Sequence, residues 1–371
     1  MADNMFFSRD SKVFVAPLAA DGSEAGVWEI PVLDGFSFSQ ATNSSEVTLN
    51  EMSAGSNVSR RGRKMFNDSL APAEWSFSTY ARPFIAAGNS DAGTVDAAAN
   101  HHAVEEVLWA MTVGSAIQTG AAFEGFTLGT DDLDISFANS NKTTLGKANI
   151  YFTLGGTTGE STITYKISNC CVNEAGLDFD IDGITTINWS GMGTIITEQA
   201  AAPTRTKYEG IGSTSNFIRN RLTELVASSA SPTSVDPYVL TLTGGSITIS
   251  NNMTFLTPET LGVVNTPLDH VTGTRSISGS FTCYLNNTSS SSMDLFENLI
   301  EGTSTVTNDF DLDFKIGGAA SVPRIEMKMP ACHLEVPTHS IDDVISLEVT
   351  FHALGTDIDS TDELAIKYVG A

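Results

Sequence analysis

The sequence predicts a mainly β protein, built from two tandem β-sandwich or barrel modules that each carry one flanking α-helix. Three observations support this class. Charged residues make up only 17% of the chain, and Ser, Thr, Asn and Gly fill their place, as in strand- and loop-rich proteins. Several short segments alternate apolar and polar residues, which is typical of half-buried strands. A pattern of about forty residues also occurs twice without a gap.

The repeat is carried by two pairs of matched segments. These are Tyr151–Gly156 with Asp313–Gly318, and Trp189–Thr194 with Phe351–Thr356. The offset is 162 residues in both pairs, and Cys170 falls on Cys332 at the same offset. A constant offset over this length indicates a duplicated domain.

Other predicted elements fit the same plan. The first copy opens with strands at Lys12–Ala16 and Val27–Ile30. An alternating strand at 34–39 matches 244–250 at offset 211, and the strand Trp75–Tyr80 matches Gly279–Tyr284 at offset 204. A helix at 104–111, which ends at Gly114, matches a helix at 293–300, which ends at Gly302, at offset 188. Because the offset falls along the chain, the first copy should contain extra loops.

The predicted organisation has three parts. Residues 1–196 form the first module, with long loop insertions near 85–102 and 116–146. Residues 197–237 form a structured linker, in which Phe217–Val226 is apolar enough to dock on the body. Residues 238–371 form the second module.

The bulk properties exclude several classes. A formal net charge of −25 argues against ordinary nucleic-acid binding, but it suits a surface past which DNA must move without adhering. The four cysteines, two of them adjacent, fit neither a disulfide framework nor a zinc site. No signal peptide, membrane span, catalytic motif or cofactor motif is found, so we expect a cytoplasmically made protein that is not an enzyme and needs no cofactor or metal.

Two runs of alternating acids are candidate functional residues: Asp178, Asp180 and Asp182 in the first copy, and Asp309, Asp311 and Asp313 in the second. The first run resembles the start of a calcium loop, but Trp189 stands where an EF-hand needs Glu. Apolar residues between the acids indicate strands with one acidic face. That face either is simply solvated or lines a shared internal surface.

Arg60, Arg61, Arg63 and Lys64 form the one dense basic cluster of the chain, inside a polar loop at 51–73. The cluster could bind nucleic acid or act as a localisation signal. In so acidic a chain, docking on an acidic neighbouring surface is better motivated. A mobile, solvated loop is the remaining reading.

Three segments resemble tail tube proteins of long-tailed bacteriophages: Ile30–Asn43, Arg63–Tyr80 and Gly244–Pro258, with Thr272–Gly279 fitting as well. The resemblance covers both copies. It implies β-sandwich modules that form rings, whose inner strands join into a barrel, and rings that stack into a hollow tube for DNA. A two-module chain is then expected to form a trimeric ring with pseudo-sixfold symmetry, which leaves no exposed strand edges.

The resemblance also implies roles for the candidate residues. The alternating acids would line the lumen, and the basic loop from Arg60 to Lys64 would reach the adjacent ring. The expected partners are further copies of the chain, the tape measure, tail terminator and tip or baseplate proteins, and double-stranded DNA that passes without specific binding. The expected location is the virion tail.

Two other functions compete with a structural role. Tandem β-sandwiches can bind glycans or a host receptor, but such sites usually expose aromatic loop residues. Here Trp75, Trp109, Trp189 and Phe281 all lie within periodic runs. An enzyme on a β scaffold, such as a glycosidase or esterase, would need a paired catalytic constellation, and the sequence contains none.

Overall fold

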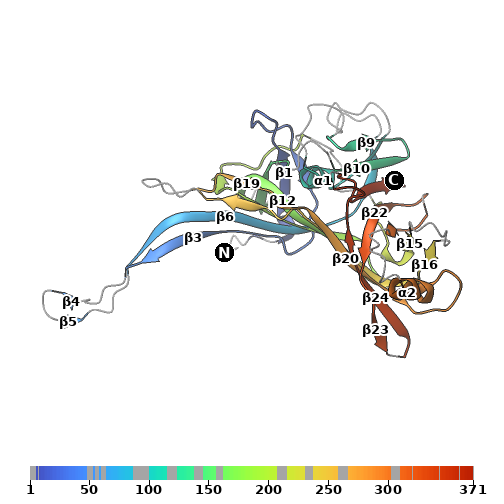
Figure 1. Ribbon diagram of the computed structural model, residues 1–371. Helices are drawn as coiled ribbons and strands as arrows, with labels where there is room; N and C mark the ends of the chain where they lie inside the picture. The colour runs from blue at the N-terminus through green and yellow to red at the C-terminus, as the bar shows by residue number, and fades with distance from the viewer. Residues whose placement is uncertain are drawn as a thin grey trace.

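The chain folds mainly into antiparallel β-strands, and the described ranges contain two α-helices (Figure 1). This confirms the prediction of a mainly β protein. The computed structural model describes residues 6, 8–47, 53–54, 58–59, 64–86, 100–114, 123–137, 145–155, 162–206, 215–229, 237–257, 266–301, 310–319, 321–341, 343–358 and 360–370.

The elements follow one another along the chain in this order: η1 (Ser8–Asp10), β1 (Lys12–Pro17), β2 (Trp28–Ile30), β3 (Ser37–Glu46), β4 (Ser53–Ala54), β5 (Val58–Ser59), β6 (Met65–Tyr80), β7 (Pro83–Ala86), β8 (Asn100–Ala103), α1 (Glu106–Thr112), β9 (Phe126–Leu128), β10 (Asp132–Ser136), β11 (Ala148–Leu154), β12 (Ile163–Asp180), β13 (Thr186–Gly193), β14 (Ile196–Gln199), η4 (Asn220–Leu222), β15 (Glu224–Ser229), β16 (Tyr238–Val239), β17 (Leu242–Ser250), β18 (Thr254–Leu256), β19 (Asp269–Val271), β20 (Ser276–Tyr284), α2 (Ser292–Glu301), β21 (Phe310–Ile316), β22 (Arg324–Leu334), β23 (Thr338–Ile341), β24 (Ile345–Ala353) and β25 (Ala365–Val369).

A central sheet runs through the molecule in the order β3, β6, β13, β12, β17, β20, β24, β23. Its strands alternate, as the sequence predicts: Trp75 and Phe77 of β6 are buried, while Glu74 is exposed and Ser76 half-buried. A period of two places all apolar side chains of a strand on one face. The central sheet therefore has one apolar and one polar face.

Outer strands cover the apolar face. One group is formed by β2, β1, β11, β14 and the first half of β12, and the other by β16, β15, β21, β25 and the first half of β22. Phe152 of β11 stacks on Phe38 of the central sheet with ring centroids 4.5 Å apart. Phe314 of β21 lies 5.5 Å from Phe351. Each half of the chain is thus a sandwich, held by a long strand that belongs to both layers.

The same pairing order occurs in both halves. The pairs β1–β11, β11–β12, β3–β6 and β6–β13 in the first half match β15–β21, β21–β22, β17–β20 and β20–β24 in the second. The register breaks also match, since one lies beside the Ala148–Cys170 pair and the other beside the Phe310–Cys332 pair. Both pairs keep the 162-residue offset.

The strand register corrects two of the sequence matches. Gly193 lies opposite Ala73 and Ala353 lies opposite Ile277, so Gly193 shares its position with Ala353 rather than with Gly355. Phe38 likewise shares its position with Ile247, and the offset there is 209 rather than 211. Both corrections are by two residues, which keeps each side chain on the same face.

Some segments predicted as connections are strands. The insertions near 85–102 and 116–146 contain β8, β9 and β10, and β10 pairs with the last strand, β25. The polar loop expected at 51–73 ends early, because β6 already begins at Met65. The predicted linker at 197–237 contains β15, which pairs along its length with β21 of the second half.

The two helices differ in their surroundings. Every residue of α1 is buried, whereas α2 exposes Met293 and Ile300. Glu105, just before α1, is fully buried. Its carboxylate accepts hydrogen bonds from the Tyr368 hydroxyl and, at 3.4 Å, from the Arg82 backbone amide. Tyr368 lies on β25, so the end of the chain closes over the first helix.

Candidate functional site

The polar face of the central sheet carries hydroxyl, amide and carboxylate groups. Its exposed acids include Glu74, Glu174, Asp178, Asp180 and Glu348. Serines and threonines of β17 and β20 continue it into the second half. None of its eight strands contains Lys or Arg, if β12 is taken from Cys171 onward. The face is therefore acidic and has no lysine or arginine of its own.

Hydrogen bonds tie neighbouring strands together on this face. The Ser78 hydroxyl donates to Asn188 Oδ1 at 2.6 Å, and Asn188 Nδ2 donates to Asp178 Oδ2 at 3.1 Å. The three residues lie side by side on β6, β13 and β12. Short side chains in such a row keep the surface smooth, because none of them extends far from the sheet.

The structure separates the two predicted acidic runs. Asp178 and Asp180 lie exposed on the polar face, and Asp182 lies in the following turn, 3.4 Å from Arg221. Asp311 and Asp313 lie on β21 in the outer layer, 3.5 Å from Lys328 and 3.6 Å from Lys315 respectively, and Asp309 lies outside the described residues.

The prediction that both runs share one surface is therefore wrong. By register, β21 occupies the position of β11 and not that of β12, so its acids cannot lie on the polar face. Glu74, Glu174 and Glu348 were not predicted from the sequence. The signal that could have found them is the absence of Lys and Arg from all the strands concerned.

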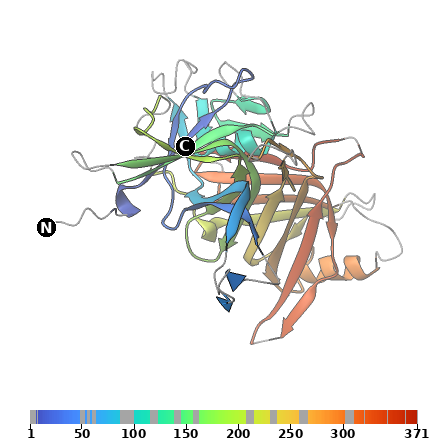
Figure 2. The same cartoon turned by 90° about the vertical axis from the view of Figure 1, so that its left-hand side faces the viewer.

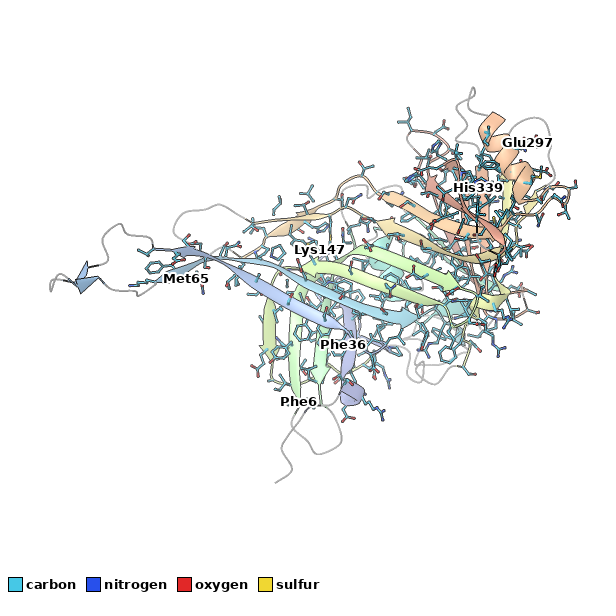
Figure 3. All side chains as sticks on the ribbon, turned by 90° about the horizontal axis from the view of Figure 1, so that it is seen from below. Phe6, Phe36, Met65, Lys147, Glu297 and His339 are labelled. Atoms are coloured by element: carbon cyan, nitrogen blue, oxygen red, sulfur yellow. The ribbon has the colours of Figure 1, made fainter. Side chains whose placement is uncertain are left out.

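A two-stranded arm projects from the body of the molecule. It is formed by the distal parts of β3 and β6, and β4 and β5 lie at its tip (Figure 1); in Figure 2 it points toward the viewer. Met65 and Phe66 on the arm are 55% and 52% exposed, and Figure 3 shows Met65 far from the body. Lys64 is exposed and lies over the Phe66 ring, while Arg60, Arg61 and Arg63 lie outside the described residues.

The central sheet ends in two strands that, in the part of the chain that the structure describes, pair on one side only. β3 pairs with β6, and β23 pairs with β24. Ile341, at the end of β23, is 79% exposed. Such edges are templates for pairing with another chain.

Cys171 and His270 are buried beside each other, but they do not form a reactive pair. Cys171 lies 3.4 Å from His270 Nδ1, but burial raises the pKa of the Cys171 thiol to about 12, so the thiol stays protonated. His270 Nε2 accepts the Leu145 amide at 3.2 Å, and its ring lies 3.0 Å from the Asp269 carboxylate. Within the described ranges, no group of His, Cys, Asp and Glu side chains could hold a metal ion. His270 therefore has a structural role, because it joins Leu145, Cys171 and Asp269.

None of the helices in the described ranges has the length and hydropathy needed to cross a membrane. Comparison with known proteins gives a consistent assignment. Residues 33–353 match the family model described as phage tail tube protein. The tail tube protein pb6 of Escherichia phage T5 is 32% identical over 364 residues, which are 96% of this chain and 74% of that relative. The chain therefore belongs to the phage tail tube protein family, a structural family rather than a family of enzymes.

Proposed function

We propose that three copies of this chain close into a ring, that the rings stack into the tail tube, and that each chain supplies two equivalent modules by duplication. The observation that carries the proposal is the junction between the two halves. There β12 pairs with β17 from Glu174–Ser250 to Asp180–Gly244. By register, β23 stands in the place of the last part of β12, and β3 stands in the place of β17. The free edges of one chain thus have the same positions as the two strands of that internal junction.

This equivalence gives the pairing between subunits. Leu177 lies opposite Ile247 at the internal junction, and Phe179 lies opposite Gly245. Transferred to the ring, these pairs become His339 with Phe38 and Ile341 with Phe36 of the neighbouring copy. Ile341 would then be covered by an aromatic ring, and both open edges would disappear.

The polar face is the one that lines the lumen in this arrangement, because the outer strands already cover the apolar face. Three copies of eight strands, about 4.8 Å apart, give a circumference of about 115 Å and a diameter of about 37 Å before strand tilt widens it. That bore admits a DNA duplex. Asp178, Asp180 and the glutamates of the same face repel its phosphates, and no Lys or Arg on those strands retains them.

The arm serves contacts between rings. Its exposed Met65 and Phe66 supply apolar area, and the basic loop, of which the structure describes Lys64, meets the acidic surface of the next ring. The tape measure, terminator and tip proteins are the further partners of such a tube in the virion. Replacing Arg60, Arg61, Arg63 and Lys64 by Glu should leave single rings but shorten or abolish tubes. Unchanged tubes would remove the basic loop from the account.

The ring is tested by Ile341→Lys. The side chain is exposed in the single chain, so the substitution should leave folding unchanged while it places a charge at the subunit junction. Negative-stain electron microscopy of concentrated protein should show rings or tubes for the wild type and dispersed particles for the variant. Ile358→Lys is the matched control, since Ile358 is fully exposed in the loop after β24. Rings of wild-type quality from Ile341→Lys would contradict the pairing.

A further inference from the structure

The turn between β12 and β13 is covered by the chain segment at 215–223. The Thr185 amide donates to Ile218 O at 2.9 Å, and the Asn220 amide donates to Gly183 O at 3.2 Å. The Thr185 hydroxyl donates to Asn220 Oδ1 at 2.7 Å. Ile218 is fully buried there. This segment comes just before β15, so it belongs to the second half but closes a turn of the first.

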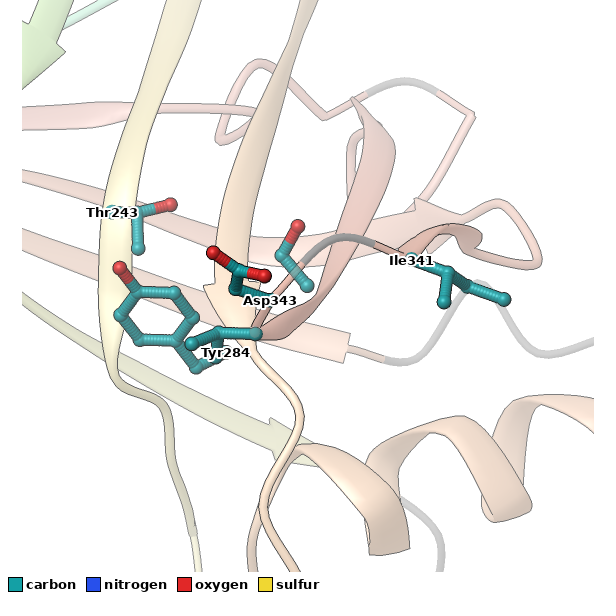
Figure 4. A pocket seen from close by; sticks show the side chains of 6 residues that line it. Thr243, Tyr284, Ile341 and Asp343 are labelled. Atoms are coloured by element: carbon teal, nitrogen blue, oxygen red, sulfur yellow. The ribbon is translucent and has the colours of Figure 1, made fainter.

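Among the described residues, no segment covers the corresponding turn between β23 and β24 in this way. This turn borders a groove of about 790 Å³ lined by Thr243, Tyr284, Ile341, Asp343, Val344 and Ser346 (Figure 4). Apolar groups are exposed in it, since Val344 is 56% and Tyr284 39% exposed.

The register relates the two places. Tyr80 of β6 and Tyr284 of β20 hold the same position. Thr185, just before β13, therefore corresponds to Ile345, the first residue of β24. Tyr80 packs edge-on against Phe217 of the covering segment, with centroids 5.3 Å apart. The groove beside Tyr284 is therefore the site that Phe217 and its neighbours fill in the first half.

One segment of the chain has the features needed to fill the groove. η1 ends two residues before Lys12, the first residue of β1. In the same way, η4 ends two residues before Glu224, the first residue of β15. Lys12 and Glu224 also hold equal register, opposite Thr153 and Lys315, which are 162 residues apart. This alignment matches Ser8 with Asn220.

Its neighbouring positions fit as well. Phe6 matches the buried Ile218 but is 44% exposed, and Arg9 matches Arg221. Arg9 would approach the acidic turn that contains Asp343, as Arg221 approaches Asp182 at 3.4 Å. Arg221 and Asp182 are both well exposed, so an ion pair of this kind adds little. The apolar contact of Phe6 should therefore contribute most of the binding free energy of the segment.

The segment does not reach the groove of its own chain. Phe6 and His339, a residue of β23 close to the groove, lie on opposite sides of the molecule (Figure 3). At the internal junction, the covering segment comes from the half whose β17 pairs with β12. The copy whose β3 pairs with β23 is therefore the one that supplies the segment.

We propose that the N-terminal segment around Phe6 and η1 docks in the Tyr284–Val344 groove of the neighbouring copy, and so latches each junction of the ring. The inference rests on the proposed ring. It assigns an interaction surface to the groove and a second copy of this chain as its occupant.

A disulfide test measures the contact directly. Ser8→Cys combined with Ile345→Cys places thiols at the positions of Asn220 and Thr185, whose side chains touch in the first half. The four natural cysteines are buried and give little background. Thr185→Cys combined with Asn220→Cys is the matched control, and it should cross-link within one chain whether or not rings form.

Mild oxidation of assembled protein, followed by gel electrophoresis without reductant, should give covalent dimers and trimers from the Ser8→Cys/Ile345→Cys chain. Dispersed monomers should give none. Rings visible by electron microscopy without cross-links, while the control pair forms, would overturn the latch but leave the ring standing. A cross-link inside dispersed single chains would also overturn it. Failure of the wild type to form rings would overturn both.

The strength of the latch is measured by Phe6→Ser. Loss of one buried aromatic contact per junction should raise the protein concentration needed for assembly about tenfold. Phe6→Leu, which keeps an apolar side chain, should restore most of the loss. An assembly threshold that Phe6→Ser leaves unchanged would contradict the latch.

Discussion

The two halves of this molecule share a pairing order but differ in what covers them. In the first half, α1 is buried on all sides and the β12–β13 turn is closed by residues 215–223. In the second half, α2 is partly exposed and the β23–β24 turn borders an open groove. In the described residues, the first half therefore finds these contacts within the chain, while the matching surfaces of the second half are exposed, and the proposed ring would cover them with another copy.

At one position of the central sheet, the two halves place an aromatic ring and a glycine on opposite strands. Trp75 lies opposite Gly191 in the first half, and Gly279 lies opposite Phe351 in the second. The aromatic residue and the glycine have exchanged strands. In each pair the ring occupies the space where a Cβ on the glycine would stand, 2.5 Å from the Trp75 ring and 2.7 Å from the Phe351 ring.

The largest expected effect comes from disturbing this exchange. Gly279→Phe adds a ring where even a Cβ would clash with Ser246 O and Phe351, so the variant should fail to fold. Phe351→Gly alone should cost about 4 kcal/mol of unfolding free energy. The double variant removes the clash with the Phe351 ring but leaves the one with Ser246 O, so it should recover part of the soluble yield that Gly279→Phe loses and unfold at lower urea than Phe351→Gly. A double variant no better than Gly279→Phe would show that the two solutions are not interchangeable.

Removing the cover of the first half should have the next largest effect. Ile218→Ala deletes a fully buried side chain and should lower the unfolding free energy by about 4 kcal/mol. Phe6→Ala at the matching position should leave the single chain unchanged in thermal unfolding, because Phe6 is partly exposed there. Equal losses from the two substitutions would contradict the contrast between the halves.

The buried carboxyl just before α1 should make stability depend on pH, and α2 has no counterpart to it among the described residues. Burial raises the pKa of Glu105 to about 7, from an ordinary value near 4.5. The folded state therefore binds this proton more tightly than the unfolded state, and stability falls as pH rises from about 4.5 to 7. Glu105→Gln should be about 3 kcal/mol more stable than the wild type at pH 8 and no different below pH 4.5. Met293, which the 188-residue offset aligns with Glu105, lies in the first turn of α2 and is exposed, so Met293→Gln should add no pH dependence.

The smallest expected effect is at the surface ion pair of the covered turn. Arg221 and Asp182 are 75% and 85% exposed, and water screens such pairs strongly. Arg221→Ala should change the thermal midpoint very little. A large loss would mean that the cover is held by charge rather than by Ile218.

The sequence predicted the strands that alternate cleanly, such as Trp75–Tyr80, because burial of one face leaves a period of two. It also predicted both helices. It missed β8, β9 and β10, whose segments looked like loop insertions. β10 is held by pairing with β25, more than two hundred residues away, and no local pattern reports such a partner.

The candidate site was predicted in part. Asp178 and Asp180 lie on the polar face as alternation within β12 required. Asp311 and Asp313 alternate equally well, yet they lie on an outer strand, because alternation reports a face and not a layer. The register with β15 and β22 was needed to place them.

The number of chains in one ring shows whether the two halves act as equivalent modules. Native mass spectrometry of rings released from tubes should give three times the 39.3 kDa chain mass, and end-on electron microscopy views of the same rings should show six lobes with threefold symmetry. A ring of six chains, or one with three lobes, would contradict the account, because the two halves would then not act as equivalent modules.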